Sequence, residues 1–208
     1  MQIVVLGGDS LFNELKTGNS EADLIQIITP GELMLFPQAD AYFDLEFENT
    51  AERIALLSRF LPRPVFINSI IAPLTQSGNL FIRINGWPSF LQRKIIEAAC
   101  LDSMQRGSAE KICNALNKTI EWVPDVPGFV SARVVSMIIN EAYFALQQNV
   151  STKKEMDTAM KLGTNYPFGP FEWSEKIGLK NIYDLLTALA ETNTRYQPAE
   201  LLKKEVLQ

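Results

Sequence analysis

Asn85, directly after a predicted strand, and Glu97, within the next predicted strand, are polar side chains that could take part in chemistry. A carboxylate such as Glu97 can act as a general base or orient another catalytic group, and general acid–base catalysis accelerates reactions by about 10²–10⁴-fold. An amide such as Asn85 forms hydrogen bonds but cannot take up a proton at neutral pH. The chain has no histidine, so no imidazole is present to act as a general base beside them. Without histidine or a Cys-x-x-Cys pair, we expect no metal site.

A short apolar run followed by two glycines opens the chain, where the Gly-x-Gly-x-x-Gly turn of a dinucleotide-binding fold would lie. Only Gly7 matches that pattern, because Asp9 stands at the second glycine position and Phe12 at the third. A carboxylate at the second position would repel a pyrophosphate, and Phe12 would prevent close helix–strand packing. We therefore expect an ordinary turn without a bound cofactor. Glu32, near the end of the second predicted strand, is the one acidic candidate for a ribose contact.

Composition and charge describe a globular protein of one or two domains. Of the 208 residues, 47% are hydrophobic and 21% charged, and the net charge is −5. This balance is not that of a disordered chain, and nucleic-acid binding would need a basic face. Cys100 and Cys113 fit a reducing compartment. Residues 64–82 carry no charge but contain asparagine, proline and glycine, so they predict a strand, a loop and another strand rather than a membrane helix. We predict a cytoplasmic protein.

The first part of the chain alternates short apolar runs with helical stretches, which is typical of a parallel α/β sheet. The predicted strands are residues 3–6, 24–28, 42–47, 65–67, 80–84, 95–99 and 119–123. Apolar spacing predicts helices between them, over residues 10–16, 50–60 and 108–117.

The second part of the chain has helical patterns alone. A long helix is predicted by one apolar stripe at helical spacing. The stripe consists of Val135, Ile138, Ile139, Ala142, Tyr143 and Leu146, with Val134 and Met137 on adjoining faces. Thr152 and Glu155 match a capping box for the next helix, which we expect Gly163 to end. The change of pattern predicts an α/β domain over residues 1–124 and a helical domain over residues 125–208.

Sequence landmarks in the second part resemble the C-terminal helical domain of the L-3-hydroxyacyl-CoA dehydrogenase family. They are Pro127-Gly-Phe, Arg133, Asn140-Glu-Ala and Tyr166-Pro-Phe-Gly-Pro-Phe-Glu. The first part is similar to the family's Rossmann-like domain, but residues 29–38 stand where the family has a long helical insertion. The resemblance implies a reduced Rossmann-like sheet domain followed by a helical domain. It also implies NAD as cofactor, a dimer joined through the helical domain, and a histidine that takes the proton of the 3-hydroxyl group.

The family's active-site positions can be transferred one at a time onto this sequence. The histidine position falls on Asn85, or on Gly86 if the alignment is shifted by one residue. The family's acid is kept at Glu97, whereas Ile70 takes a substrate-side serine position, as Ile71 does, and Ala132 takes that of an asparagine.

The altered positions predict a 3-hydroxyacyl-CoA dehydrogenase-like protein without dehydrogenase activity, a pseudoenzyme kept as a dimeric scaffold, binding or regulatory protein. One alternative is an acyl-CoA enzyme or a subunit of a composite dehydrogenase in fatty-acid or hydroxybutyryl-CoA metabolism. Another is a sensor that holds an acyl-CoA-like ligand in a cleft between the domains. We predict a homodimer joined through the helical domain, with NAD implied by the family but its site lost.

Overall fold

The computed structural model describes residues 1–18, 20–77 and 79–208. The chain divides into two compact units, Met1–Phe129 and Val130–Gln208, which we call unit 1 and unit 2. Each is described by itself.

Unit 1 is built on a seven-stranded sheet with the strand order β2-β1-β3-β4-β5-β6-β7. The strands are β1 (Gln2–Leu6), β2 (Asp23–Ile27), β3 (Ala41–Asp44), β4 (Val65–Asn68), β5 (Ile82–Ile84), β6 (Ile95–Ala99) and β7 (Thr119–Trp122). Neighbouring strands are parallel except β5 and β6, which are antiparallel. Every predicted strand is present, so the prediction of a mostly parallel sheet is confirmed.

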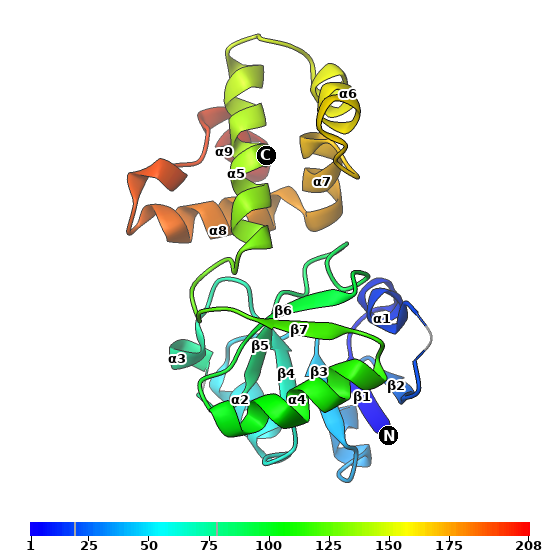
Figure 1. The fold of residues 1–208 in the computed structure, drawn as a ribbon. Coiled ribbons are helices and arrows are strands. Elements are labelled where there is room, and N and C mark those ends of the chain that lie inside the picture. The colour runs from blue at the N-terminus through cyan, green and yellow to red at the C-terminus, as the bar shows by residue number, and fades with distance from the viewer. Residues whose placement is uncertain (19, 78) are drawn as a thin grey trace. The chain divides into compact units, whose positions relative to one another are not determined.

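Helices cover both faces of this sheet (Figure 1). They are α1 (Asp9–Lys16), the 3₁₀ helix η1 (Pro30–Leu35), α2 (Ala51–Ser58), α3 (Leu74–Ser77) and α4 (Ser103–Ala115). Thr50 caps α2 by accepting a hydrogen bond from the Arg53 amide. The start of α4 lies upstream of the predicted residue 108, because Asp102 caps the helix by accepting a bond from the Met104 amide.

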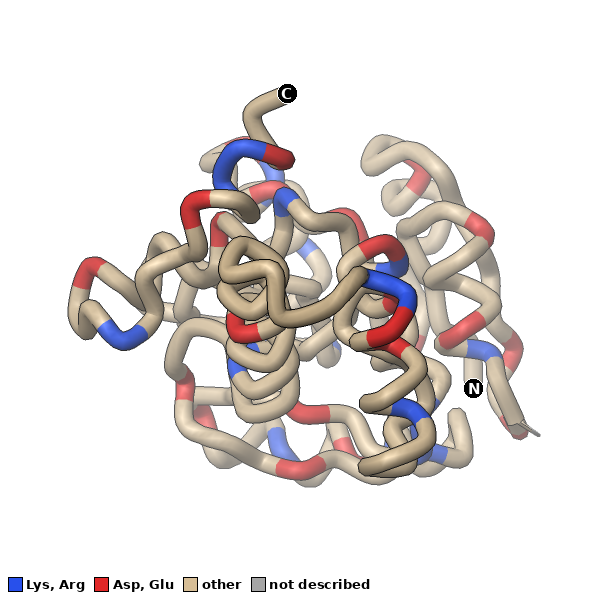
Figure 2. Tube along the Cα trace, turned by 90° about the horizontal axis from the view of Figure 1, so that it is seen from above, with Lys and Arg blue, Asp and Glu red and all other residues tan. Residues whose placement is uncertain are grey.

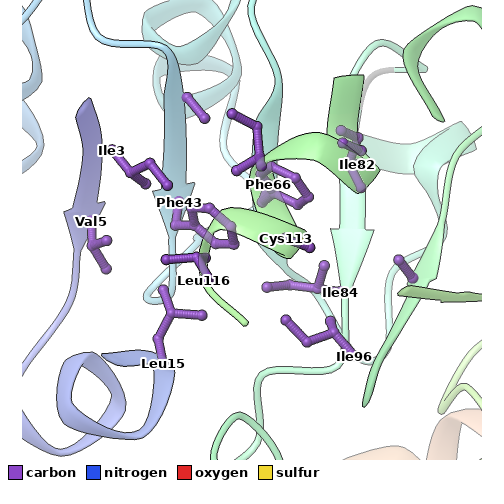
Figure 3. Packing of buried hydrophobic residues seen from close by; sticks show 14 of the residues in the cluster. Ile3, Val5, Leu15, Phe43, Phe66, Ile82, Ile84, Ile96, Cys113 and Leu116 are labelled. Carbon is purple, nitrogen blue, oxygen red and sulfur yellow. The ribbon is translucent and has the colours of Figure 1, made fainter. Parts of the chain in front are cut away.

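Strand alternation divides the core between the two faces of the sheet. Ile3, Val5 and Phe43 pack against α1 and α4, with Phe43 stacked on Phe66 at 4.2 Å between ring centroids (Figure 3). The opposite face carries Val4, Leu6, Ile27, Leu33, Tyr42, Leu57 and Phe60, which come from strands, η1, α2 and the turn after α2. Because both faces are buried, the strands read as nearly continuous apolar runs.

The chain leaves β1 toward β2 on one side and then reaches β3 on the other side. In open α/β sheets, such a reversal marks the crevice where ligands bind, at the carboxyl ends of the strands. The connection from β2 to β3 contains only the short η1 helix. The reduced size of this half, predicted from the sequence, is therefore real.

The last residues of unit 1 are anchored by the buried Arg83. Its guanidinium forms an ion pair with Asp125, donates to the Val126 carbonyl at 2.6 Å, and lies 4.1 Å from the centre of the Phe129 ring. Asp125 also accepts a bond from the Leu74 amide at 2.8 Å. Burial lowers the pKa of Arg83, whereas Asp125 raises it. The Pro-Gly-Phe landmark thus belongs to a strap fixed onto unit 1.

Unit 2 consists of helices packed around α5 (Figure 1). They are α5 (Ser131–Gln147), α6 (Lys153–Thr164), α7 (Pro170–Ile177), α8 (Leu179–Ala190), the 3₁₀ helix η2 (Thr194–Tyr196) and α9 (Glu200–Leu207). α5 contacts α7, α8 and α9. The buried Asn140 side chain donates to the Gln197 carbonyl at 3.0 Å and accepts from the Ala199 amide at 2.8 Å, which fixes the turn before α9.

The start and the end of α6 compare differently with the sequence prediction. The predicted capping box of Thr152 and Glu155 is present. The prediction that Gly163 ends α6 is wrong, because the helix continues to Thr164 and is capped by Asn165, which takes the left-handed conformation with φ of 56°. Gly169 is required by packing: a Cβ there would lie 2.3 Å from the Asp157 Cα atom. Asp157 also accepts a bond from the Phe171 amide in the first turn of α7, at 2.8 Å.

Within the described residues, no helix has the length and apolar character needed to cross a membrane. Basic and acidic residues are interspersed along the chain (Figure 2). Cys100 and Cys113 are buried and free. The cytoplasmic location stays a prediction.

Candidate functional site

Asn85 and Glu97 form a hydrogen-bonded pair beside β5 and β6. The antiparallel register pairs Ile84 with Ala98, so the next residue along, Asn85, lies opposite Glu97. The Asn85 side-chain amide donates to Glu97 Oε2 at 2.9 Å, and its backbone amide donates to the Glu97 carbonyl at 3.1 Å. Asn85 is buried and Glu97 is half-buried. The sheet therefore brings together the two residues singled out in the sequence.

The neighbouring position, Gly86, has no room for a side chain. A Cβ at Gly86 would lie 2.7 Å from the Asn68 Cγ atom. Asn68 accepts a bond from the Gly86 amide at 2.9 Å and donates to the Leu45 carbonyl at 3.0 Å, so it ties the ends of β3 and β4 to this turn. Of the two aligned positions, Asn85 is the one whose side chain contacts the acid.

Of the other transferred positions, Ile71 is half-buried, whereas Ile70 and Ala132 are packed into the protein. Ile70 is 7% exposed, and its carbonyl accepts a bond from the Gly128 amide at 2.8 Å. Ala132 lies in α5 and is fully buried in unit 2. Neither residue offers a polar group from its side chain.

The turn between β1 and α1 has its polar groups satisfied by the chain itself. The Gly8 amide donates to Glu46 Oε1 at 2.8 Å. Asp9 Oδ1 accepts from the Gln26 side-chain amide at 3.0 Å, and the same amide donates to the Gly7 carbonyl at 3.0 Å. Two carboxylates therefore face the turn where a dinucleotide-binding protein holds a pyrophosphate.

Close packing explains the remaining glycine and the phenylalanine of this turn. A Cβ at Gly7 would lie 3.1 Å from the Leu45 Cβ atom. Phe12 is buried in the core between α1 and the sheet, at the position where the glycine pattern would place its third glycine. Glu32 caps the start of η1, where its Oε2 accepts bonds from the Ile28 and Thr29 amides at 3.1 and 2.7 Å. These bonds and that of the Thr29 hydroxyl lower the pKa of Glu32.

Asp44, the last residue of β3, is a fully buried carboxylate near the same turn. It pairs with Arg53 of α2 at 2.7 Å and accepts a bond from the Glu46 amide at 3.2 Å. Burial raises the pKa of Asp44 from its ordinary value of 3.8 to about 6, although Arg53 acts in the opposite direction. The carboxyl ends of β1 and β3 thus carry more acidic than basic groups.

Residues of this edge that the sequence did not single out are Glu46, Asn68 and the Asp44–Arg53 pair. Glu46 and Gly8 are separated by 38 positions, so no local pattern connects them. A visible signal was the cluster of acids in residues 44–48 directly after an apolar strand.

A second candidate site is an apolar groove of about 640 Å³ on unit 2. Its lining includes Val134, Met137 and Ile138 from α5 and Met156 and Met160 from α6. Val134 is 52% exposed. The predicted apolar stripe of α5 is divided by the packing: one part faces this groove, whereas the buried Val135, Ile139 and Tyr143 pack inside the unit.

A nicotinamide dinucleotide, which the family resemblance implies, does not fit the β1–α1 turn as it stands. Its pyrophosphate needs backbone amides at the start of α1, and the Gly8 amide is already bonded to Glu46. A ligand anion there would also meet Asp9. In the part of the chain that the structure describes, no group of three or more His, Cys, Asp or Glu side chains could hold a metal ion.

The fold and these sites define a Rossmann-like α/β unit followed by a helical unit of dehydrogenase type. Two solved structures share the fold over 99% of this chain. They are (S)-3-hydroxybutyryl-CoA dehydrogenase PaaH1 from Ralstonia eutropha, with a TM-score of 0.75, 18% identity and 93% of that chain covered, and M. tuberculosis FadB2, with a TM-score of 0.78, 15% identity and 92% covered.

Residues 128–208 match the family described as "3-hydroxyacyl-CoA dehydrogenase, C-terminal domain". The helical part of the chain thus resembles this family's C-terminal domain, as its landmarks predicted. Over 92 residues the chain is 44% identical to 3-hydroxyadipyl-CoA dehydrogenase of Escherichia coli K12, which is 43% of this chain and 19% of that protein. Over 112 residues it is 38% identical to a probable 3-hydroxybutyryl-CoA dehydrogenase of Bacillus subtilis, which is 53% of this chain and 37% of that protein. The chain thus spans well under half the length of these relatives.

The comparisons contradict the prediction of a dimeric scaffold without dehydrogenase activity. The relatives at 38–44% identity carry the names of dehydrogenases, and the fold matches dehydrogenase structures over nearly the full chain. They favour the alternative prediction, an acyl-CoA enzyme or a subunit of one.

Proposed function

We propose that the protein is a subunit of a composite 3-hydroxyacyl-CoA dehydrogenase that acts in fatty-acid or hydroxybutyryl-CoA metabolism. The observation that carries this proposal is the match of residues 128–208 to the C-terminal domain of that enzyme family. Relatives named as dehydrogenases of 3-hydroxyadipyl-CoA and 3-hydroxybutyryl-CoA support a CoA thioester as substrate.

A second polypeptide chain supplies the dinucleotide site in this proposal. The support comes from the β1–α1 turn, where Glu46 is bonded to the Gly8 amide and Asp9 is bonded to Gln26. The short connection between β2 and β3 points in the same direction, because it leaves little structure to cover an adenosine. The chain brings the Asn85–Glu97 pair and the helical unit to the complex.

The helical unit joins two copies of this chain through the groove between α5 and α6. An uncovered apolar surface of this kind is typical of an interface. Arg133, Met137 and Glu141 all line it at intervals of four residues, so they share one face of α5. If a twofold axis passes at Met137 and the two helices run antiparallel, Arg133 of each copy faces Glu141 of the other. The groove is thus complementary in charge to itself, as a symmetric interface requires.

The test combines the purified chain with a full-length 3-hydroxybutyryl-CoA dehydrogenase of the same organism. We expect a complex in size-exclusion chromatography with light scattering. We also expect the mixture to form NADH from 3-hydroxybutyryl-CoA and NAD several times faster than the two proteins measured separately. Two separate peaks together with an additive rate would refute the composite enzyme.

A matched pair of variants tests whether Glu97 takes part. Glu97→Gln keeps the size of the side chain and removes the carboxylate. Glu121→Gln makes the same change at the exposed residue that lies opposite Glu97 on β7. The rate gain should fall with the first variant and stay with the second. An E97Q complex as active as the original would remove Glu97 from the reaction.

A further inference from the structure

We infer that the Glu46 carboxylate takes the place of a ligand phosphate at the start of α1, so that unit 1 forms its dinucleotide-type turn without any ligand. This inference concerns contacts inside unit 1 and does not rest on the proposed composite enzyme.

The first step is the position of the carboxylate. Gly8 is the N-cap residue of α1 and has no side chain with which to cap the helix. The first amides of a helix lack partners within the helix, and an anion placed there is stabilised by them and by the helix dipole. Glu46 Oε1 accepts a hydrogen bond from the Gly8 amide at 2.8 Å. Glu46 therefore occupies the place that a phosphate takes in dinucleotide-binding proteins.

The second step is that the backbone around Glu46 is held in place. The Leu45 amide donates to the Leu6 carbonyl at 2.9 Å, which continues the pairing of β3 with β1. The Leu45 side chain packs against Gly7. The Glu46 amide donates to Asp44, whose buried charge is matched by Arg53. The carboxylate is thus presented to the turn by structure that is already ordered.

The third step is the electrostatic consequence. Asp9 follows directly after the N-cap and its carboxylate is bonded to Gln26. With Glu46 it places two negative charges at the turn, and like charges near each other disfavour a further anion. An aspartate at the second glycine position is compatible with the fold because no phosphate needs that space. Asp9 and Glu46 together thus account for a turn that is stable without a ligand, and they predict a weak affinity for dinucleotides.

The test measures inorganic pyrophosphate binding by calorimetry at constant ionic strength, with Glu46→Ala, the double variant Asp9→Gly with Glu46→Ala, and Glu48→Ala. Glu48 is an exposed acid two positions further along, so its variant removes the same charge without touching the turn. We expect the original protein and E48A to bind pyrophosphate equally weakly, and the double variant to bind at least ten times more tightly. Equal affinity of the original protein and the double variant would overturn the inference.

Hydrogen exchange provides a readout that does not depend on a ligand. The Gly8 amide should exchange at least three times faster in E46A than in the original protein, whereas E48A should leave it unchanged. Glu46→Gln, which keeps an acceptor oxygen and loses the charge, should lie between them. An unchanged Gly8 amide in E46A would also overturn the inference, whatever the outcome of the activity test with the second chain.

Discussion

The candidate sites of unit 1 and unit 2 differ in whether the chain itself occupies them. At the strand ends of unit 1, the polar backbone groups of the turn and the buried charge of Asp44 are bonded to the chain's own side chains, which are Glu46, Gln26 and Arg53. On unit 2, the groove beside α5 leaves Val134 half exposed and two methionines of α6 only half-buried. The difference is that unit 1 bonds the polar groups of its turn within the chain, whereas unit 2 keeps an apolar groove open at its surface.

The largest expected effect is a difference in folding between two variants, one in the core of unit 2 and one in its groove. Ile139→Asp places a charge at a fully buried position and should unfold unit 2, because an unpaired buried charge costs several kcal/mol. Ile138→Asp makes the same change at the next residue, which lines the groove, and should leave a folded monomer. Circular dichroism and light scattering report both results. A folded I139D protein, or an I138D protein that is still dimeric, would break the comparison.

Unit 1 should depend strongly on the internal pairing of its charges. Asp125→Ala leaves the guanidinium of Arg83 buried without its carboxylate, and loss of one partner of a buried pair costs about 3–5 kcal/mol. We expect that loss in the free energy of unfolding, measured with urea. Asp184→Ala breaks an exposed pair with Lys180, which is 76% exposed, and should cost less than about 1 kcal/mol. Similar costs for both variants would contradict the assignment of Arg83 as an anchor.

Two glycines of unit 2 provide the next test. Gly169→Ala forces a methyl group against the Asp157 backbone and should destabilise unit 2 by about 3 kcal/mol, at the upper end for overpacking. Gly163→Ala, in α6 with no atom within 4 Å of the new Cβ, should stabilise it by about 0.5–1 kcal/mol, because alanine favours helices. Thermal unfolding should therefore move in opposite directions. Equal shifts would show that the close approach of Asp157 does not constrain Gly169.

Asp44 gives the smallest expected effect, as a dependence of stability on pH. Its pKa is raised from 3.8 to about 6 by burial, so the folded protein holds the proton more tightly than the unfolded chain does. The stabilisation is complete below about pH 4 and is lost as the pH rises through about 6, by about 2 kcal/mol between pH 4.5 and 7. Asp44→Asn should flatten this slope in urea titrations at several pH values. A slope that persists in D44N would assign the effect to another group.

The strands and helices could be predicted because their causes are local. Alternating burial and apolar runs identified every strand of the sheet, and cap residues such as Thr50 and Thr152 identified helix starts. The groove could not be predicted in the same way. The apolar residues of α5 cover most of its circumference, and only the packing of α7, α8 and α9 decides that Ile139 is core while Ile138 is not.

The site needed contacts that span large distances in the sequence. Asn85 and Glu97 were identified by the family resemblance, and their side chains meet where β5 pairs with β6. Asn68, which accepts a bond from the Gly86 amide 18 positions away, was not identified. Glu46 could not be connected with Gly8 by any spacing rule, since the bond forms only when β3 pairs with β1. The main functional prediction was wrong for another reason: it inferred loss of activity from substitutions at single positions, whereas the relatives at 38–44% identity carry the names of dehydrogenases.

The anchor at Arg83 determines where the protein can be divided for work on isolated fragments. A fragment that ends at residue 124 would lose the carboxylate of Asp125, the carbonyl of Val126 and the ring of Phe129 that surround the buried guanidinium. A fragment that ends after Phe129 keeps all three. Proteases should likewise spare residues 125–129 in the intact protein, although a proline and a glycine there suggest a linker, because this segment is held by side chains from the sheet.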